Sequence, residues 1–414
     1  MRMAPRAYPR GSELAAPLLP PVPTAERAER LLPLLFLRAL IPAACVVFLL
    51  LVLQPGADDT PSHPLGGELR VGEELVDETF SPRTVVLTFF EPEFAPWRNH
   101  SLKPRRLWHA LSGWPLLYFE RWQLLVVCTG MGPRRAAAVV TALGFDGRLD
   151  LRSSLWLISG VAGIDPLAGT VGAVVWASYI TDMASAFYVD RTEVGFPQEW
   201  ETSWLPLTCT SPFCDGEGSR AEAESDELAF KLNHSLVNWA YETTRHIKLP
   251  DSREMNATRT PFADAGFTLA AKPPSVIRGD TLSGATVWVG YVSAEWARKW
   301  VPYWTGGKGK FATSAMEDSA IATALTLLGR AQRADPRNAR RLLSLRAAAN
   351  FCTQRPGVSI SEFVSSFTST HSNSTNKGKY WRPGWDPVTH QAAVNAARTA
   401  LIIVEAVARG DVPS

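Results

Sequence analysis

The stretch QLLVVCTGMGPRRAA, residues 123–137, decides the fold of this chain, and LWLISGVAG, residues 155–163, repeats its pattern. Each is an apolar run of strand length that ends in small residues, and the first continues through Gly130 and Gly132 into an Ala-rich, helix-forming segment. An α/β sheet presents backbone N–H groups to a ligand in this way, at the carboxyl ends of its strands. Glycines also close ordinary tight turns, so the motifs further along decide whether this is a ligand site.

The composition is that of a globular protein. The chain has 414 residues, of which 46% are apolar and 20% charged, enough for a core in one large or two ordinary domains. The formal net charge of +2 and the lack of a long block of like charge argue against a nucleic-acid partner. We expect neither a metal ion nor an organic cofactor.

The N-terminal part differs from the rest. Residues 1–30 are rich in Pro, Arg and Ala, which predicts a disordered tail in the cytosol. Residues 31–54 are almost entirely apolar, with Arg38 near one end, and are long enough to cross a hydrocarbon layer of ~30 Å. A signal-anchor transmembrane helix is therefore predicted over 31–54, followed by a linker over 55–80.

The charges around this segment predict its orientation. Five arginines precede it, against three acids, which favours an N-terminus in the cytosol. The chain would then be a type II, single-pass membrane protein whose body lies in the lumen or outside the cell. The alternative is a cleaved secretory signal, which would make the protein secreted.

Acceptor triplets for N-glycosylation also indicate export of the body. They follow the apolar segment, in stretches that read as loops or helix ends, at Asn99, Asn233, Asn256 and Asn373. Two of the five cysteines, Cys209 and Cys214, share a Pro-containing loop and can form a small disulfide in an oxidising compartment.

From residue 83, strand-like runs alternate with helical patterns. Strands are predicted over 84–90, 123–128, 155–159, 171–179, 275–278, 310–314 and 342–348, and helices over 133–143, 294–304, 317–331 and 387–409. This alternation predicts a three-layer α/β/α sandwich with a mainly parallel, mixed sheet. The exception is 191–267, a polar, Trp-rich and Pro-rich insertion that we expect to form a subdomain or lid.

Five blocks of sequence resemble a known family. They are TFFEPEFAPW (88–97), VVCTGMGPRRAAA (126–138), LRSSLWLISGVAGIDPLAGTVGAVVWASY (151–179), SAMEDSAIATAL (314–325) and RAAANFCTQRP (346–356). In this order they resemble the fungal purine nucleoside permeases and, more distantly, the nucleoside phosphorylase and nucleosidase superfamily, especially bacterial methylthioadenosine nucleosidases. The resemblance implies a sandwich of the nucleoside phosphorylase type over 81–414, with a purine nucleoside bound at the carboxyl ends of the strands.

The resemblance also implies roles for individual residues. The loop beside the ribose and the nucleophile would be Thr129, Gly130, Met131 and Gly132, and the strand end that lines the base would be Ser159, Gly160, Val161, Ala162 and Gly163. Met316 would pack on the sugar, and Glu317 would accept hydrogen bonds from both ribose hydroxyls. One ionised carboxylate can accept two O–H donors and so distinguish a diol from a deoxy sugar. A Glu at a helix start is also favoured simply by the helix dipole.

Two further positions bear on the reaction class. Glu93 matches the nucleosidase carboxylate that holds and deprotonates the attacking water, although a rigid turn at Pro92 would equally explain an acid there. Asn350 falls where the nucleosidases carry the Asp that protonates the departing purine. An amide donates and accepts hydrogen bonds but carries no acidic proton, which suits a 6-oxopurine or a slower reaction. Arg346, nearby, would orient Glu317 or a ligand oxygen.

These residues predict cleavage of the N-glycosidic bond of a purine nucleoside. Hydrolysis ranks above phosphorolysis because no Gly-rich phosphate loop is evident, while Arg134 and Arg135 leave open a role for phosphate as co-substrate. The alternative is a non-catalytic nucleoside-binding protein that contributes to transport. One predicted span cannot form a transport path, so transport would require oligomerisation, a partner transporter or an indirect effect. We expect a homo-oligomer.

Overall fold

The computed structural model describes residues 78–109, 111–184, 186–200, 202–207, 209–214, 228–334, 341–369 and 386–413. The predicted tail, the predicted anchor helix, nearly all of the predicted linker and Asn373 lie outside these residues. Residues 67–414 belong to one compact unit, which contains the domain predicted to begin at residue 81.

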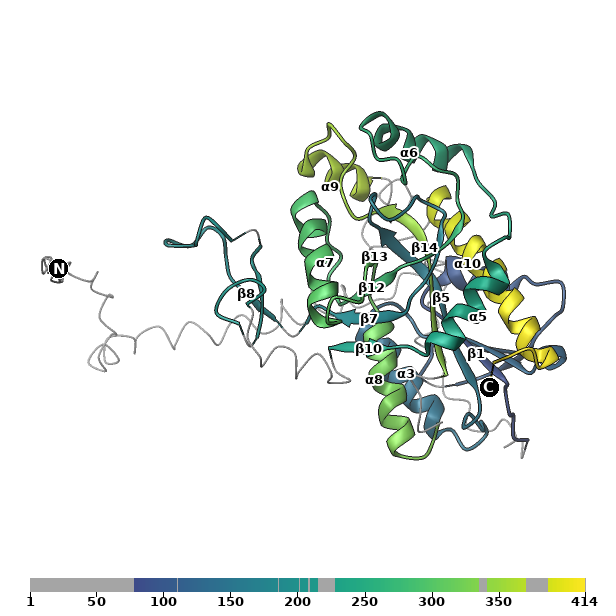
Figure 1. Ribbon diagram of the computed structural model, residues 1–414. Helices are drawn as coiled ribbons and strands as arrows, with labels where there is room; N and C mark the ends of the chain where they lie inside the picture. The colour runs from purple at the N-terminus through teal and green to yellow at the C-terminus, as the bar shows by residue number, and fades with distance from the viewer. Residues whose placement is uncertain are drawn as a thin grey trace, which may run out of the picture. The chain divides into compact units, whose positions relative to one another are not determined.

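A mixed sheet of twelve strands forms the centre of this unit (Figure 1). Its strands are β1 (Thr84–Thr88), β2 (Arg105–Leu107), β3 (Leu116–Phe119), β4 (Leu124–Cys128), β5 (Leu155–Ile164), β6 (Val174–Trp176), β7 (Tyr179–Asp182), β10 (Ala229–Lys231), β11 (Val276–Arg278), β12 (Asp280–Ser283), β13 (Phe311–Ala315) and β14 (Leu342–Phe351). The main path runs β10-β7-β12-β13-β5-β1-β4-β3-β2, and β14 and β6 join it through β5. A separate two-stranded sheet pairs β8 (Ala186–Tyr188) with β9 (Trp204–Pro206).

Most pairs at the centre of the sheet are parallel, although β5–β13 and β6–β14 are antiparallel, and the margins of the main path are antiparallel. Strand β1 runs parallel to β4 and β5, β5 runs parallel to β14, and β12 runs parallel to β7 and β13. The pairs β2–β3, β3–β4 and β7–β10 are antiparallel. Parallel strands need a covering layer on each face, because the crossover connections put helices there.

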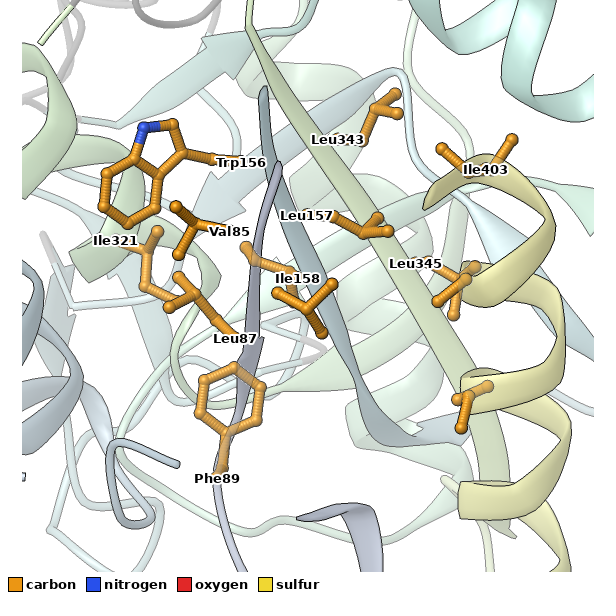
Figure 2. Close-up of a cluster of buried hydrophobic side chains, with 14 of the residues drawn as sticks. Val85, Leu87, Phe89, Trp156, Leu157, Ile158, Ile321, Leu343, Leu345 and Ile403 are labelled. Carbon is orange, nitrogen blue, oxygen red and sulfur yellow. The ribbon is translucent and has the colours of Figure 1, made fainter. Parts of the chain in front are cut away.

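Helices supply both layers. They are α2 (Glu91–Arg98), α3 (Pro133–Phe145), α5 (His234–Thr244), α6 (Arg253–Asp264), α7 (Tyr291–Trp304), α8 (Asp318–Arg330), α9 (Ile360–Ser369) and α10 (Pro387–Arg409). Helix α10 packs on β14 and β5 and contacts α2 and α5, while α3 packs against α8. In Figure 2, Leu343 and Leu345 lie toward Ile403 of α10, whereas Trp156 and Val85 lie toward Ile321 of α8. The predicted three-layer sandwich with a mixed sheet is confirmed.

One helix in the described part of the chain is long and apolar enough to span a membrane by length and composition, namely α10. In its most apolar 18-residue window, 61% is buried inside the body. Its buried Asn395 donates hydrogen bonds to the carbonyl oxygens of Gly172 (2.9 Å) and Pro250 (3.0 Å). These contacts, and the packing of Ile403 in the core, make α10 a core helix of the sandwich.

The segment 191–267 is only partly the separate insertion that its composition predicts. Its first part, with β9 and the loop to residue 214, lies outside the main sheet. From residue 228 it is built into the body, since β10 pairs with β7 at the sheet margin and α5 packs on α10 and β6. Leu236, Val237 and Ala240 of α5 are buried, so this part of the segment is packed into the body.

Strand β5 changes partners halfway along its length. Its first residues pair with β1 as far as Ile158, and its last residues, Gly163 and Ile164, pair with β13. Between them, residues 159–162 keep β14 on one edge, but no described strand pairs with their other edge. Buried backbone groups on that edge need other partners, and the candidate site forms where those partners are supplied.

Candidate active site

Glu93 occupies the open edge of β5. It is the third residue of α2, is 2% exposed, and its Oε1 accepts a hydrogen bond from the Val161 backbone N–H at 2.7 Å. Its Oε2 accepts from the N–H of Phe89 at 2.6 Å, just before the helix, where no N-cap side chain does so. Glu93 is therefore a helix residue whose carboxyl group joins the start of α2 to β5, and not an exposed turn residue.

Gly160 is the small residue that this arrangement requires. A Cβ atom at this position would lie 2.7 Å from Nη1 of Arg346, 2.8 Å from Oε1 of Glu93 and 2.9 Å from a ring carbon of Phe89. Real Cβ atoms do not approach other atoms so closely, so any side chain here would displace this group. The glycine predicted to line the base thus allows three side chains to meet against the backbone of β5.

Arg346 lies opposite Gly160 on β14 and is 1% exposed. Its Nη1 donates to the carbonyl oxygen of Val161 at 3.1 Å, and its guanidinium carbon lies 4.5 Å from the ring centre of Phe89. Its Nη2 donates to Oε2 of Glu317 at 2.9 Å. Both backbone groups of Val161 are therefore bound by ionisable side chains, one from α2 and one from β14.

Glu317 joins this group to the glycine-containing loop. It is 3% exposed, and its Oε1 accepts from the backbone N–H of Gly132 at 2.9 Å. Gly132 and Gly130 have φ angles of +94° and +82°, in the left-handed region that favours glycine. The two predicted motifs, 185 residues apart in sequence, therefore meet through one hydrogen bond.

Asp318 completes the group and was not among the predicted residues. It is fully buried at the start of α8 and accepts hydrogen bonds from Arg346 and from the Ser344 hydroxyl. In the sequence its position suggested no more than an acid in a first helical turn. We call Glu93, Glu317, Asp318 and Arg346 the carboxylate cluster.

The carboxylate cluster holds three carboxyl groups for one guanidinium. Burial raises the pKa of Glu93 to about 8, with the Arg346 charge opposing and the Glu317 charge adding to the rise. Burial likewise raises the pKa of Glu317, against the opposing charge of Arg346. Burial lowers the pKa of Arg346, but the charges of Asp318 and Glu317 outweigh it and hold that pKa above its usual value. Glu93 is therefore mostly protonated at neutral pH and ionises just above it.

The other predicted binding residues surround the carboxylate cluster to different degrees. Thr129 is buried, and its N–H donates to the carbonyl oxygen of Thr88, where β1 ends. Ser159 is buried, and its hydroxyl has no hydrogen-bond partner among the described residues. Ala162 is buried as well. The partly exposed positions are Met131, Gly132, Val161, Gly163, Met316 and Asn350.

Asn350 lies beside Gly163, at a β-bulge between Ala348 and Asn350 in the pairing of β14 with β5. Its Nδ2 donates to the carbonyl oxygen of Phe351 at 2.9 Å and would lie 3.2 Å from a Cβ placed on Gly163. Asn350 is thus on the same strand as Arg346 but beyond the bulge.

The remaining predicted residues lie elsewhere. Arg134 and Arg135 are exposed at the start of α3, with the Arg135 side chain against Gly130. Cys209 and Cys214 are joined by a disulfide. No group of His, Cys, Asp and Glu in the described residues is arranged to hold a metal ion.

Two of the three described glycan acceptors lie at helix ends, as the sequence predicted. Asn99 is exposed at the end of α2, and the Asn233 side chain caps the start of α5. Asn256 is exposed in the first turn of α6, and its glycosylation stays a prediction. The pattern of the triplet gave no information on the surrounding helix.

Comparisons with known proteins give one family. The family model described as purine nucleoside permease matches residues 81–407. The chain is similar to a probable purine nucleoside permease of Schizosaccharomyces pombe, 26% identical over 258 residues, which cover 60% of this chain and 72% of the relative. It is also similar to a purine nucleoside permease of Candida albicans, 22% identical over 294 residues, which cover 69% and 68% of the two chains.

Solved structures similar to this chain include two enzymes. One is the 5′-methylthioadenosine/S-adenosylhomocysteine nucleosidase of Colwellia psychrerythraea in complex with adenine, 17% identical with a TM-score of 0.44, over 79% of this chain and 96% of that one. The other is the futalosine hydrolase of Helicobacter pylori, 12% identical with a TM-score of 0.45, over 78% and 97%.

We predict that Gly160→Ala destabilises the protein by about 1 to 3 kcal/mol, because the new methyl group must push apart Glu93, Arg346 and Phe89. The measurement is the denaturant midpoint of the purified full-length chain. Gly147→Ala is the control, since a Cβ there would meet nothing within 4 Å. Equal midpoints for the two variants would contradict the close packing at Gly160.

Proposed function

Because the chain belongs to the purine nucleoside permease family, we propose that its body binds a purine nucleoside at the carboxylate cluster and hydrolyses the N-glycosidic bond. The observation that carries this proposal is Glu93, a buried carboxyl group held by two backbone N–H groups at the carboxyl ends of the central strands. Its environment places its ionisation close to neutral pH, where a general base is most useful.

The charge of the carboxylate cluster suits the transition state of this reaction. As the bond to the base lengthens, positive charge develops on the sugar ring. Once Glu93 is ionised, three carboxylates beside one guanidinium leave a surplus of negative charge in a buried setting, where fixed charges interact strongly. The carboxylate cluster would therefore stabilise the charge that forms only during the reaction.

Each residue then has a defined task. The Glu93 carboxylate takes a proton from water while the water oxygen bonds to the anomeric carbon, and the purine departs with the electron pair of the broken bond. Glu317 keeps free lone pairs beside those used by Gly132 and Arg346, so it can accept from both ribose hydroxyls. Asn350 offers the departing purine an amide without an acidic proton, which favours a 6-oxopurine.

A second function has one observation in its favour. The Asn350 amide, already bound to the carbonyl oxygen of Phe351, cannot protonate a leaving group. The same chain with slow or absent turnover would be a nucleoside-binding component of purine nucleoside uptake, in line with the names of its relatives. Measurement of base release separates the two functions.

We also propose that residues 31–54 anchor the body to a membrane and leave it on the luminal or external side, as a homo-oligomer. The exposed acceptor Asn99 fits this orientation, because glycosylation occurs in the lumen. Full-length protein made in eukaryotic cells should then sediment with membranes and lose mass on glycosidase treatment. Unmodified protein in the cytosolic fraction would contradict the anchor.

We predict that Glu317→Gln weakens the binding of inosine much more than that of 2′-deoxyinosine. The loss of a charged acceptor is worth about 1.5 to 3 kcal/mol, or about 10-fold to 150-fold in affinity, and only the ribose presents both hydroxyls. The measurement is equilibrium binding to the full-length chain in detergent. The control is Met316→Leu, which changes the residue next to Glu317 but keeps an apolar side chain of similar volume and leaves the Glu317 carboxylate in place. Equal losses for both sugars would leave Glu317 as a helix-end residue.

We predict that Glu93→Gln lowers release of free purine by about 10²-fold to 10⁴-fold while nucleoside affinity is retained. Because the ionised form is the base, kcat/KM of the unchanged protein should fall as pH drops below about 8. In the variant, kcat/KM should no longer depend on pH in this range. The assay uses inosine, guanosine and adenosine, each with and without phosphate.

Glu91→Gln is the matched control for this assay, since Glu91 lies on the same helix and pairs with Arg98. Glu93→Gln should also cost about 1 to 3 kcal/mol of stability, because an amide offers one acceptor to two buried N–H donors. Binding without any base release by the unchanged protein would favour the transport component.

A further inference from the structure

Asp318 is the most deeply buried member of the carboxylate cluster. It is fully buried, and its Oδ2 lies 2.5 Å from Nη2 and 3.1 Å from Nε of Arg346. Its Oδ1 accepts from the Ser344 hydroxyl at 2.6 Å. Ser344 is on the same strand as Arg346 and is also fully buried. The ion pair therefore has a fixed geometry, with its carboxylate in the first turn of α8, where the helix dipole favours negative charge.

Arg346 is held unequally by the two acids beside it. Two of its nitrogens donate to Asp318, whereas Nη2 alone reaches Glu317, at 2.9 Å. Among the described residues, no hydrogen bond or ion pair joins Glu93 to Arg346, although both lie against Gly160. We propose that Asp318 is a positioning residue: its carboxylate holds the Arg346 guanidinium in place and takes up most of its charge, so that Glu93 and Glu317 remain available to a ligand.

The argument follows from charge in a buried setting. Without the negative charge of Asp318, the guanidinium would be balanced by Glu317 and Glu93 alone. Opposite charges attract strongly where water is excluded, so Arg346 would draw Glu317 into a closer pair and favour the ionised form of Glu93. Glu317 and Glu93, which should bind the sugar and the water, would then be paired with the Arg346 guanidinium. This inference rests on the proposed function for the identity of the ligand, but not for the charge balance.

The titratable groups that act on Glu93 come from three elements. Arg346 lies on β14, Glu317 lies at the start of α8, and Cys128 lies at the end of β4. Of these, only Arg346 is a cation. A change in how strongly Asp318 binds Arg346 therefore reaches Glu93 through the guanidinium.

The test compares Asp318→Asn with Ser344→Ala in the full-length chain in detergent. Glu93 has a raised pKa in the folded state, so its contribution to stability is complete below its usual pKa of 4.5 and is lost as pH rises through about 8. The Tm of the unchanged protein should therefore fall between about pH 5 and about pH 9. In Asp318→Asn the freed guanidinium lowers the pKa of Glu93, and this fall should shrink to less than half.

Ser344→Ala removes a hydrogen bond of Asp318 but keeps its charge, so the fall in Tm should match that of the unchanged protein. A merely structural role for Asp318 predicts the same pH dependence in both variants, which would overturn the proposal. If Asp318→Asn does not fold, Asp318→Ser replaces it, because this variant also removes the charge while Glu317 still balances the guanidinium. Failure of both variants to fold would also overturn the proposal.

Ligand binding separates this inference from the proposed function. In Asp318→Asn, the preference for inosine over 2′-deoxyinosine should fall by about five-fold or more, because Glu317 is drawn toward Arg346. The two ideas can fail separately. If Asp318→Asn shows the smaller fall in Tm with pH, the role of Asp318 is supported. If the unchanged protein binds inosine and 2′-deoxyinosine equally well, the ribose role of Glu317 is contradicted.

Discussion

The structure of the site depends on the backbone of Val161. At this residue β5 has left β1 and has not yet reached β13, so its N–H and carbonyl groups need partners other than a strand. Glu93 accepts from the N–H, and Arg346 donates to the carbonyl. Each of these ionisable side chains is buried where it makes this bond, and each then requires further partners. The carboxylate cluster thus follows from a break in strand pairing.

Much of the fold could be predicted from local pattern. The strand predicted over 123–128 is β4, the strand predicted over 155–159 is the first half of β5, and the helical pattern at 387–409 is helix α10 with those bounds. The strand β12 was missed because its four residues, DTLS, have neither an apolar run nor alternation. The end of 191–267 was misjudged because its overall polarity hid the apolar positions Leu232, Leu236 and Ala240, which have helical spacing.

The site could be predicted in part, and for a different reason. No periodicity indicates that Glu93, Glu317 and Arg346 meet, because more than 200 residues separate the first from the others. Their grouping came from resemblance to a family, which also gave Gly132 and Gly160. Asp318 could not be found in this way. Its significance depends on the distance to Arg346 across α8 and β14, and a sequence carries no such distance.

The β-bulge on β14 lies between two residues of the candidate site. Arg346 pairs with Gly160 on one side of it, and Asn350 pairs with Gly163 on the other. Since the extra residue absorbs shifts in register, the tip of β14 can vary in sequence without moving the arginine. A substitution at Asn350 or Phe351 should therefore leave Arg346 opposite Gly160, with its bonds to Asp318 and Glu317 unchanged.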